Sequence, residues 1–373
     1  MRRFLRGRQW TPAMSVSRTA QSDGSSARPA TALDVSDAGA VAKALVPYRT
    51  AKRLRGWMEV LVTCLPLAAI WLAACIAVHF RIWWGMALVI PAAAFLLRLF
   101  MIQHDCGHGS FFADKRSNDW LGRVIGVLTL TPYDYWRHSH AVHHATSGNL
   151  DRRSLGNVET LTVAEFAALG WWGRLGYRLY RHPLVMFGLG PAYMFILQQR
   201  LPIGLMRSGW RPWLSTMGTN LAIAAFVGAT FWLLGWEAVL FVSLPTALLA
   251  ATVGVWLFFV QHQFESTHWS RGGDWDLRQA ALHGSSHYDL PPVARWFTAN
   301  IGLHHVHHLS SRIPSYRLGE VLRDVPQLGD VGRITFLQSF RCIGLSLWDE
   351  ASERLVTFGE YRRLYGRGRA VAG

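Results

Sequence analysis

The chain of 373 residues is 51% hydrophobic and only 16% charged, and it contains 18 tryptophans and 10 tyrosines. Its formal net charge is +15, but the basic residues are dispersed and accompany no recognised nucleic-acid module, which argues against a nucleic-acid partner. The composition instead favours a membrane protein, because Trp and Tyr gather at bilayer interfaces and basic loops suit an anionic membrane face.

The N-terminal segment, residues 1–45, is rich in Ser, Ala, Arg and Thr and has little apolar periodicity. Such a composition buries too little apolar surface to fold, so we expect a disordered basic tail. Its Arg-rich, acid-poor opening resembles a transit peptide. Met14 is an alternative to Met1 as the start of translation.

Four apolar segments are long enough to cross a bilayer, which takes about 20 helical residues. They are residues 60–78, 83–102, 213–234 and 238–260. Arg98 lies about one turn inside the end of the second segment, from where its side chain can reach the interface. The shorter apolar runs 121–133 and 184–197 are predicted to be interfacial or re-entrant, and a fifth and sixth crossing there stay open as alternatives.

The distribution of Lys and Arg predicts the orientation of these segments. Eleven basic residues precede Trp57, the stretch 103–212 is also basic, and so is the chain after Val260. The two turns between paired segments carry only Arg81. Because Lys and Arg favour the cytoplasmic side, we expect two hairpins with both termini and all histidine clusters in the cytoplasm.

Three histidine clusters stand beside the apolar segments with the spacings HxxxH, HxxHH and HxxHH. Residues three or four apart share one face of a helix, so each cluster presents imidazoles to a common ion, and each HxxHH turns a neighbour toward a second ion. One zinc ion takes about four ligands, so eight histidines suffice for two ions. The eight are His104, His108, His140, His143, His144, His304, His307 and His308.

Other residues near the clusters do not follow this spacing. We expect His138, His268, His283, His287 and His305 to orient ligands or water rather than to bind metal. Asn300 lies four residues before His304 and would share its helical face if that stretch is helical. It is then an oxygen ligand or a residue that holds a water molecule; the alternative is an asparagine that caps a helix or packs in the core. Cysteines 64, 75, 106 and 342 form no CxxC pair and indicate no disulfide framework.

Longer motifs around the clusters resemble the membrane fatty acid desaturases, in particular bacterial acyl desaturases of the omega-6 (Δ12) type. The similarity runs from about Val46 to about Leu322. It rests on Val-Pro-Tyr-Arg-Thr at 46–50, His-Asp-Cys-Gly-His-Gly-Ser-Phe-Phe at 104–112, Val-Gln-His-Gln-Phe-Glu at 260–265, Gly-Ser-Ser-His-Tyr-Asp-Leu-Pro at 284–291, and Asn-Ile-Gly-Leu-His-His-Val-His-His-Leu-Ser-Ser-Arg-Ile-Pro at 300–314.

The resemblance implies a fold: an all-α integral membrane protein with four transmembrane helices in two hairpins and a cytoplasmic helical cap that holds a di-iron site. It also implies His262 as a ninth ligand. The expected organisation is a disordered tail (1–45), a desaturase domain (46–345) and a C-terminal cytoplasmic tail (346–373) in a bacterial inner membrane.

The same resemblance implies a reaction, the O2-dependent insertion of a cis double bond at two non-haem irons. The substrate would be a fatty acyl lipid or an acyl thioester, and a separate ferredoxin or small haem protein with its reductase would supply electrons. A related membrane di-iron hydroxylase or ketolase, and a metal transporter, are the alternatives. A soluble di-iron carboxylate enzyme needs two Glu-x-x-His repeats, and this chain has one, at 265–268.

Overall fold

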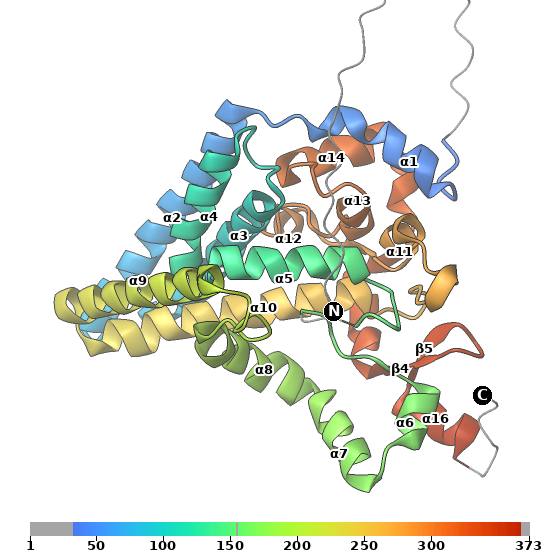
Figure 1. Ribbon diagram of the computed structural model, residues 1–373. Helices are drawn as coiled ribbons and strands as arrows, with labels where there is room; N and C mark the ends of the chain where they lie inside the picture. The colour runs from blue at the N-terminus through green and yellow to red at the C-terminus, as the bar shows by residue number, and fades with distance from the viewer. Residues whose placement is uncertain (1–32, 154–155, 367–373) are drawn as a thin grey trace, which may run out of the picture. The chain divides into compact units, whose positions relative to one another are not determined.

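The computed structural model describes residues 33–153 and 156–366 of the chain. Most of the predicted N-terminal tail, including Met14, lies outside these residues. Long helices dominate the described residues, and several short helices and two small sheets complete them (Figure 1). The two sheets modify the expected all-α class.

Four helices among the described residues are long and apolar enough to cross a membrane, as predicted. Two of them carry ligand histidines past the predicted C-terminal end of the apolar run: the second continues from Ile102 to His108, and the fourth from Val260 to His262. Continuous helix therefore carries three histidines past the apolar part. The four are α2 (Arg53–His79), η2 with α3 (Trp83–Leu88 and Val89–His108), α9 (Trp210–Leu234), and η6 with α10 (Ala238–Ser243 and Leu244–His262).

Arg98 on α3 does not extend to an interface, contrary to the prediction. Its side chain is buried, and its guanidinium donates to the Glu59 carboxylate on α2 and to the Trp296 carbonyl. The guanidinium also lies 4.0 Å from the centre of the Trp296 ring. A buried cation is tolerated when its partners satisfy it, and the carboxylate partner lies one residue before the predicted start of the first apolar segment.

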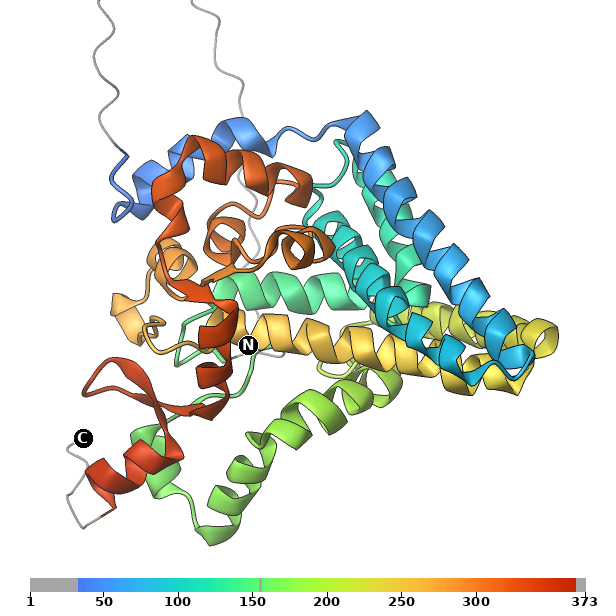
Figure 2. The same cartoon turned by 180° about the vertical axis from the view of Figure 1, so that it is seen from behind.

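The helices that carry the remaining histidines gather at the ends of α3 and α10. Figures 1 and 2 both show α5 beside the C-terminal half of α10, with α11 to α14 grouped past the end of α3. We call this group the end layer. Its helices are α5 (Tyr133–Thr146), α11 (Leu277–His283), α12 (Pro292–Phe297), α13 (His304–Leu309) and α14 (Ser315–Asp324), and α4 (Lys115–Leu128) lies alongside α3.

The apolar run 184–197 forms a continuous series of short helical pieces with exposed Leu184, Leu189 and Leu197. At 1.5 Å per residue such a run is about 20 Å long, shorter than the roughly 30 Å hydrocarbon core. Its interfacial or re-entrant placement stays a prediction. The pieces are η3 (Val185–Leu189), α8 (Gly190–Ala192), η4 (Tyr193–Leu197) and η5 (Gln198–Arg200), preceded by α7 (Trp171–Tyr180). The run 121–133 falls mostly on α4.

The described part of the predicted N-terminal tail is folded, so that prediction is wrong for residues 33–45. The Asp37 side chain accepts from the backbone N–H groups of Gly39 and Ala40 at the start of α1 (Ala38–Ala44), and Val41 and Leu45 are fully buried. Their apolar contacts are with side chains of the end layer, among them Leu318 and Val321. The 3-10 turn η1 (Val46–Arg49) connects α1 to α2, the first of the four long helices.

Residues 346–366, the described part of the predicted C-terminal cytoplasmic tail, contain two strands and a helix. Strand β4 (Leu345–Asp349) pairs in parallel with β1 (Leu161–Thr162) and antiparallel with β5 (Arg354–Thr357). Helices α6 (Val163–Ala168) and α16 (Phe358–Tyr365) lie next to this sheet. The other elements are η7 (Gly272–Asp274), β2 (His287–Asp289) paired in parallel with β3 (Arg333–Thr335), η8 (Pro326–Gly329), α15 (Phe336–Ser339) and η9 (Phe340–Gly344).

Candidate metal centre

Each histidine cluster lies on a helix, as its spacing predicts. His104 and His108 occupy the last two turns of α3. The helix is followed by Gly109, in the left-handed conformation (φ +65°) that glycine adopts without strain. The second cluster lies on the C-terminal half of α5 and the third on α13. His262 is the last residue of α10.

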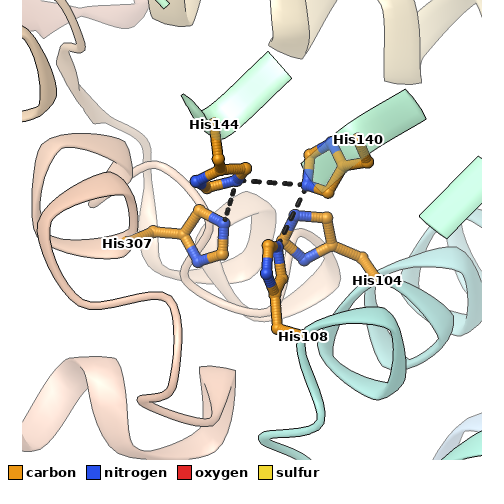
Figure 3. A group of neighbouring side chains, drawn as sticks. All are labelled: His104, His108, His140, His144 and His307. Carbon is orange, nitrogen blue, oxygen red and sulfur yellow. Dashed lines mark hydrogen bonds between the residues drawn. The ribbon is translucent and has the colours of Figure 1, made fainter. Parts of the chain in front are cut away.

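Five histidines from three helices form one group, shown in Figure 3. We call it the five-histidine group. The Nε2 atoms of His140 and His108 are 3.0 Å apart, those of His144 and His140 are 3.2 Å apart, and those of His307 and His144 are 3.2 Å apart. One ring nitrogen from each lies within 4.8 Å of the others. The members are His104, His108, His140, His144 and His307.

A second group joins the remaining four, and we call it the four-histidine group. Its members are His143, His262, His304 and His308, again with one ring nitrogen each within 4.8 Å of the others. The Nε2 atoms of His304 and His262 are 3.0 Å apart. All nine histidines expected to be ligands thus fall into two groups that can each hold a metal ion.

The two HxxHH motifs divide between the groups in a regular way. In α5 the i, i+4 pair His140 and His144 enters the five-histidine group, and His143 enters the other. In α13 the i, i+4 pair His304 and His308 enters the four-histidine group, and His307 enters the other. Adjacent side chains on a helix point about 100° apart, so one short helix serves both groups.

The geometry of the rings fits bound metal ions. Bonds of about 2.0–2.1 Å from nitrogen to metal, at angles near 90–110°, put neighbouring ligand nitrogens roughly 2.9–3.4 Å apart, which matches the closest Nε2 pairs. Among the described residues, the buried Nε2 atoms of His143 and His308 have no hydrogen-bond partner. A metal ion bound there would supply the partner that these nitrogens lack.

The protonation state of the rings also suits metal binding, which requires neutral imidazole. Burial lowers the pKa of His143 to about 4. Burial, followed by the neighbouring histidines, lowers the pKa of His140, His144 and His307 well below the ordinary value. These four rings are therefore neutral near pH 7.

Two oxygen atoms that orient histidine rings could not be identified from the sequence. The Nδ1 of His143 hydrogen-bonds to the Asn157 side-chain oxygen, and the Nδ1 of His262 lies 3.2 Å from the Gly284 carbonyl. An Nδ1–H that donates to an oxygen leaves Nε2 free to bind a metal. Asn157 lies in a loop far from any helical spacing, so no local signal points to it. Trp136, which stacks on His140 at 4.6 Å, does lie four residues before it.

The residues expected to orient ligands have mixed outcomes. His138 is exposed on α5, which contradicts that role. Asn300 adopts the left-handed conformation (φ +60°) in a turn before α13, so it does not share a helical face with His304, and its amide lies 3.5 Å from the Ser315 carbonyl. His305 is buried, and its Nε2 lies 2.9 Å from the Leu328 carbonyl.

A cavity of about 600 Å³ adjoins both histidine groups. Side chains of α3, α5 and α10 and of the run 185–199 line it, and most of them are apolar. His104 and His140 reach it from the five-histidine group, and His143 and His304 from the other. A molecule in this cavity can therefore approach both groups at once.

Comparison with known proteins gives consistent results. Residues 81–338, which include all nine histidines, match the family model described as fatty acid desaturase. A "Fatty acid desaturase" of Bacillus subtilis is 43% identical over 301 residues, which span 81% of this chain and 85% of that protein. An "sn-1 acyl-lipid omega-3 desaturase (ferredoxin)" of Synechocystis is 30% identical over 269 residues, 67% and 70% of the two chains. An "sn-1 oleoyl-lipid 12-desaturase" of Anabaena variabilis is 24% identical over 292 residues, 71% and 75% of the two chains.

Proposed function

The chain belongs to the fatty acid desaturase family and is an oxidoreductase, and on that premise we propose that it inserts a cis double bond into an acyl chain at the Δ12 (omega-6) position. The observation that carries this proposal is the apolar cavity that meets both histidine groups. An acyl chain is apolar, as most of the cavity wall is. Two neighbouring carbons of a chain in the cavity would lie next to both histidine groups. A bilayer lipid or an acyl thioester would supply the chain.

We propose that the nine histidines hold two iron ions, five around one and four around the other. Iron bound there would supply, with O2, the strong oxidant that removes hydrogen from methylene groups without an acidic proton. The protein itself holds the rings neutral, orients them through Asn157 and the Gly284 carbonyl, and surrounds the chain with apolar side chains that exclude water. Positioning of this kind accounts for much of an enzyme's rate.

The Δ12 position is supported by the omega-6-type motifs and by similarity to two proteins named oleoyl-lipid 12-desaturases. The one from Anabaena variabilis is 24% identical and the one from Synechocystis is 27% identical. Relatives named omega-3 desaturases are similar to this chain as well.

We further propose two hairpins with the histidine groups on the cytoplasmic side of an inner membrane. The short turns after α2 and after α9 are joined by an ion pair, in which Arg81 and Glu237 lie 3.0 Å apart. Two turns in contact lie on the same side of a bilayer. The opposite ends of α3 and α10 carry His108 and His262, and the distribution of Lys and Arg assigns that side to the cytoplasm.

The experiment that tests the function is expression in a bacterial host whose lipids contain oleoyl chains but no diunsaturated ones. Lipid analysis should reveal a new diunsaturated chain with its second double bond at Δ12, and expression of His144→Ala should not produce it. A hydroxylated or ketone product would support the related hydroxylase or ketolase instead. An unchanged lipid profile, with the protein present in the membrane and loaded with iron, would contradict the proposal.

A further inference from the structure

Gln199 is a polar residue of the cavity wall that takes no part in the metal centre. Gln199 lies in η5 and lines the cavity, and only 7% of its surface is exposed. Its Oε1 has no hydrogen-bond partner among the described residues. Buried polar atoms are nearly always paired, so this amide indicates a polar group that occupies the cavity during function.

The backbone next to Gln199 is held firmly, so the side chain cannot leave the cavity easily. The Arg200 guanidinium donates to the Asn220 side-chain oxygen at 2.8 Å and to the Leu130 carbonyl. The Asn220 amide donates back to the Arg200 carbonyl at 2.8 Å. These bonds join η5 to α9 and to the turn after α4, and they fix the amide in the wall.

The part of the cavity wall that α10 contributes is made of small residues and leaves room for a chain. Ala247, Ala250, Ala251 and Gly254 line the cavity at three- and four-residue spacings, on one face of the helix. A Cβ at Gly254 would meet only the Leu97 side chain, at 3.6 Å. At 1.5 Å per residue, Gly254 lies about 12 Å along the helix from His262, so these small residues extend well beyond the metal centre.

The chemistry of the wall identifies the group that Gln199 binds. The methylenes of an acyl chain offer no hydrogen-bonding atom, and the carbonyl at the head of the chain is the polar group that remains. None of the described residues that line the cavity is Lys or Arg, and Glu159 is among them. Such a wall disfavours a free carboxylate and suits the uncharged carbonyl of an ester or thioester. A rotation of the amide exchanges Oε1 and Nε2, so an N–H can face this carbonyl.

We propose that Gln199 binds the acyl carbonyl of the substrate, an ester or a thioester, and thereby fixes which carbons lie beside the histidine groups. The proposal rests on the desaturase function given above. It has a direct consequence for regiochemistry. Because the carbonyl end is held, the double bond is placed by counting from the carbonyl, and a longer methyl end leaves that position unchanged.

The first test measures binding without turnover. Metal-free protein is titrated with a saturated acyl ester, and the fluorescence of Trp136 and the other tryptophans reports occupancy of the cavity. Gln199→Leu should raise Kd about tenfold, the effect of one lost hydrogen bond. Gln279→Leu, the same substitution at an exposed glutamine of α11, should leave Kd unchanged. If Gln199→Leu binds as tightly as the wild type, the partner of the amide is water only and the proposal is wrong.

The second test uses the iron-loaded enzyme with acyl chains that differ only in the length of the methyl end. The wild type should keep the double bond at one distance from the carbonyl, and Gln199→Leu should raise KM about tenfold and spread the double bond over neighbouring positions. Phospholipid esters and acyl thioesters are assayed separately, and the carrier whose KM depends on Gln199 is the source of the carbonyl. A double bond at constant distance from the methyl end, or faster turnover of free fatty acid, would overturn the proposal.

The design separates this inference from the proposed function. If the wild type desaturates no acyl chain, the desaturase proposal fails, whereas an active wild type with an unaltered Gln199→Leu variant overturns the carbonyl contact alone. Should Gln199→Leu not accumulate, Gln199→Met keeps an unbranched side chain of similar size and removes the same hydrogen bond.

Discussion

The rings of His144 and His308 stack with their centres 4.0 Å apart, although His144 belongs to the five-histidine group and His308 to the four-histidine group. The two groups are thus in direct contact, and the HxxHH motifs of α5 and α13 each contribute to both. A change in one group is therefore transmitted to the other through neighbouring residues on the same helix.

Replacement of His144 should empty both groups rather than one. In His144→Ala a ligand is lost from the five-histidine group, and the stacking partner of His308 disappears with it, so we expect turnover to fall at least 100-fold. Iron per chain, measured by elemental analysis, should fall from two to less than one. His138→Ala, at an exposed position six residues earlier on α5, is the control and should keep both. Full iron content in His144→Ala would contradict the shared centre.

Replacement of Asn157 should weaken metal binding without removal of a ligand. Asn157→Leu deletes the oxygen that accepts from His143 Nδ1, and loss of such a partner typically lowers metal affinity or activity 10- to 100-fold. Competition with a chelator measures the affinity. Asn157→Asp keeps an acceptor oxygen and should restore most of it. Equal affinity for wild type and Asn157→Leu would show that the loop does not orient the ring.

The metal-free protein should lose stability as pH falls. His143, with a pKa of about 4, and His305, with a pKa of about 3, stay neutral in the folded state, whereas in the unfolded chain they take up protons below about pH 6.5. Stability is therefore full above pH 6.5 and falls by about 1.4 kcal/mol per pH unit for each such group, down to the pKa of that group in the folded state. Thermal unfolding in detergent across this range measures the slope.

The contribution of His305 to that slope can be isolated. His305→Gln keeps a donor for the Leu328 carbonyl but does not titrate, so its unfolding temperature should depend less steeply on pH than that of the wild type between pH 6.5 and 3. A slope identical to that of the wild type would show that the pKa of His305 is not depressed.

The orientation in the membrane can be tested with single cysteines. Arg152→Cys lies beside the histidine groups on an exposed loop, and Ile82→Cys lies in the turn between α2 and η2. In sealed right-side-out vesicles a membrane-impermeant thiol reagent should label Ile82→Cys and spare Arg152→Cys, and inside-out vesicles should reverse the pattern. The native cysteines are buried or half-buried and provide a low background. Labelling of both positions from the same side would break the two-hairpin arrangement.

Turnover should depend on an added electron carrier. Each desaturation consumes two electrons beyond those from the substrate, and the sequence has neither a GxGxxG nucleotide motif nor a cysteine set for an iron–sulfur cluster. Purified protein should thus be inactive with NAD(P)H and O2 alone and active when ferredoxin and its reductase are added. Higher salt should weaken the coupling, since exposed charges are screened over about 8–10 Å at physiological ionic strength. Sustained turnover without a carrier would contradict this expectation.

Local spacing explains why so much of the metal centre could be predicted. His140 and His144 are four residues apart on one helix, so their joint approach to an ion follows from helix geometry, as does the separate direction of His143. The apolar lengths likewise predicted the four long helices, because the bilayer sets a minimum length that few other structures require.

Contacts between distant segments could not be predicted in this way. Arg98 pairs with Glu59 across two helices, and Leu161 pairs with Leu347 although 186 residues separate them in the chain. Neither relationship leaves a periodic signal in the sequence. Prediction from helical spacing also failed at short range, at Asn300. Two successive residues with positive φ, Ala299 and Asn300, prevent a continuous helix from Asn300 to His304.

The buried pairing of Arg98 with Glu59 and the Trp296 carbonyl bears on biogenesis. Glu59 enters with the first long helix, Arg98 with the second, and Trp296 is synthesised roughly 200 residues later. Until that last segment arrives, the guanidinium lacks one of its acceptors in surroundings that do not tolerate an unsatisfied charge. A chain truncated before Trp296 would therefore leave the Arg98 guanidinium without its carbonyl acceptor and without the aromatic ring on which it lies.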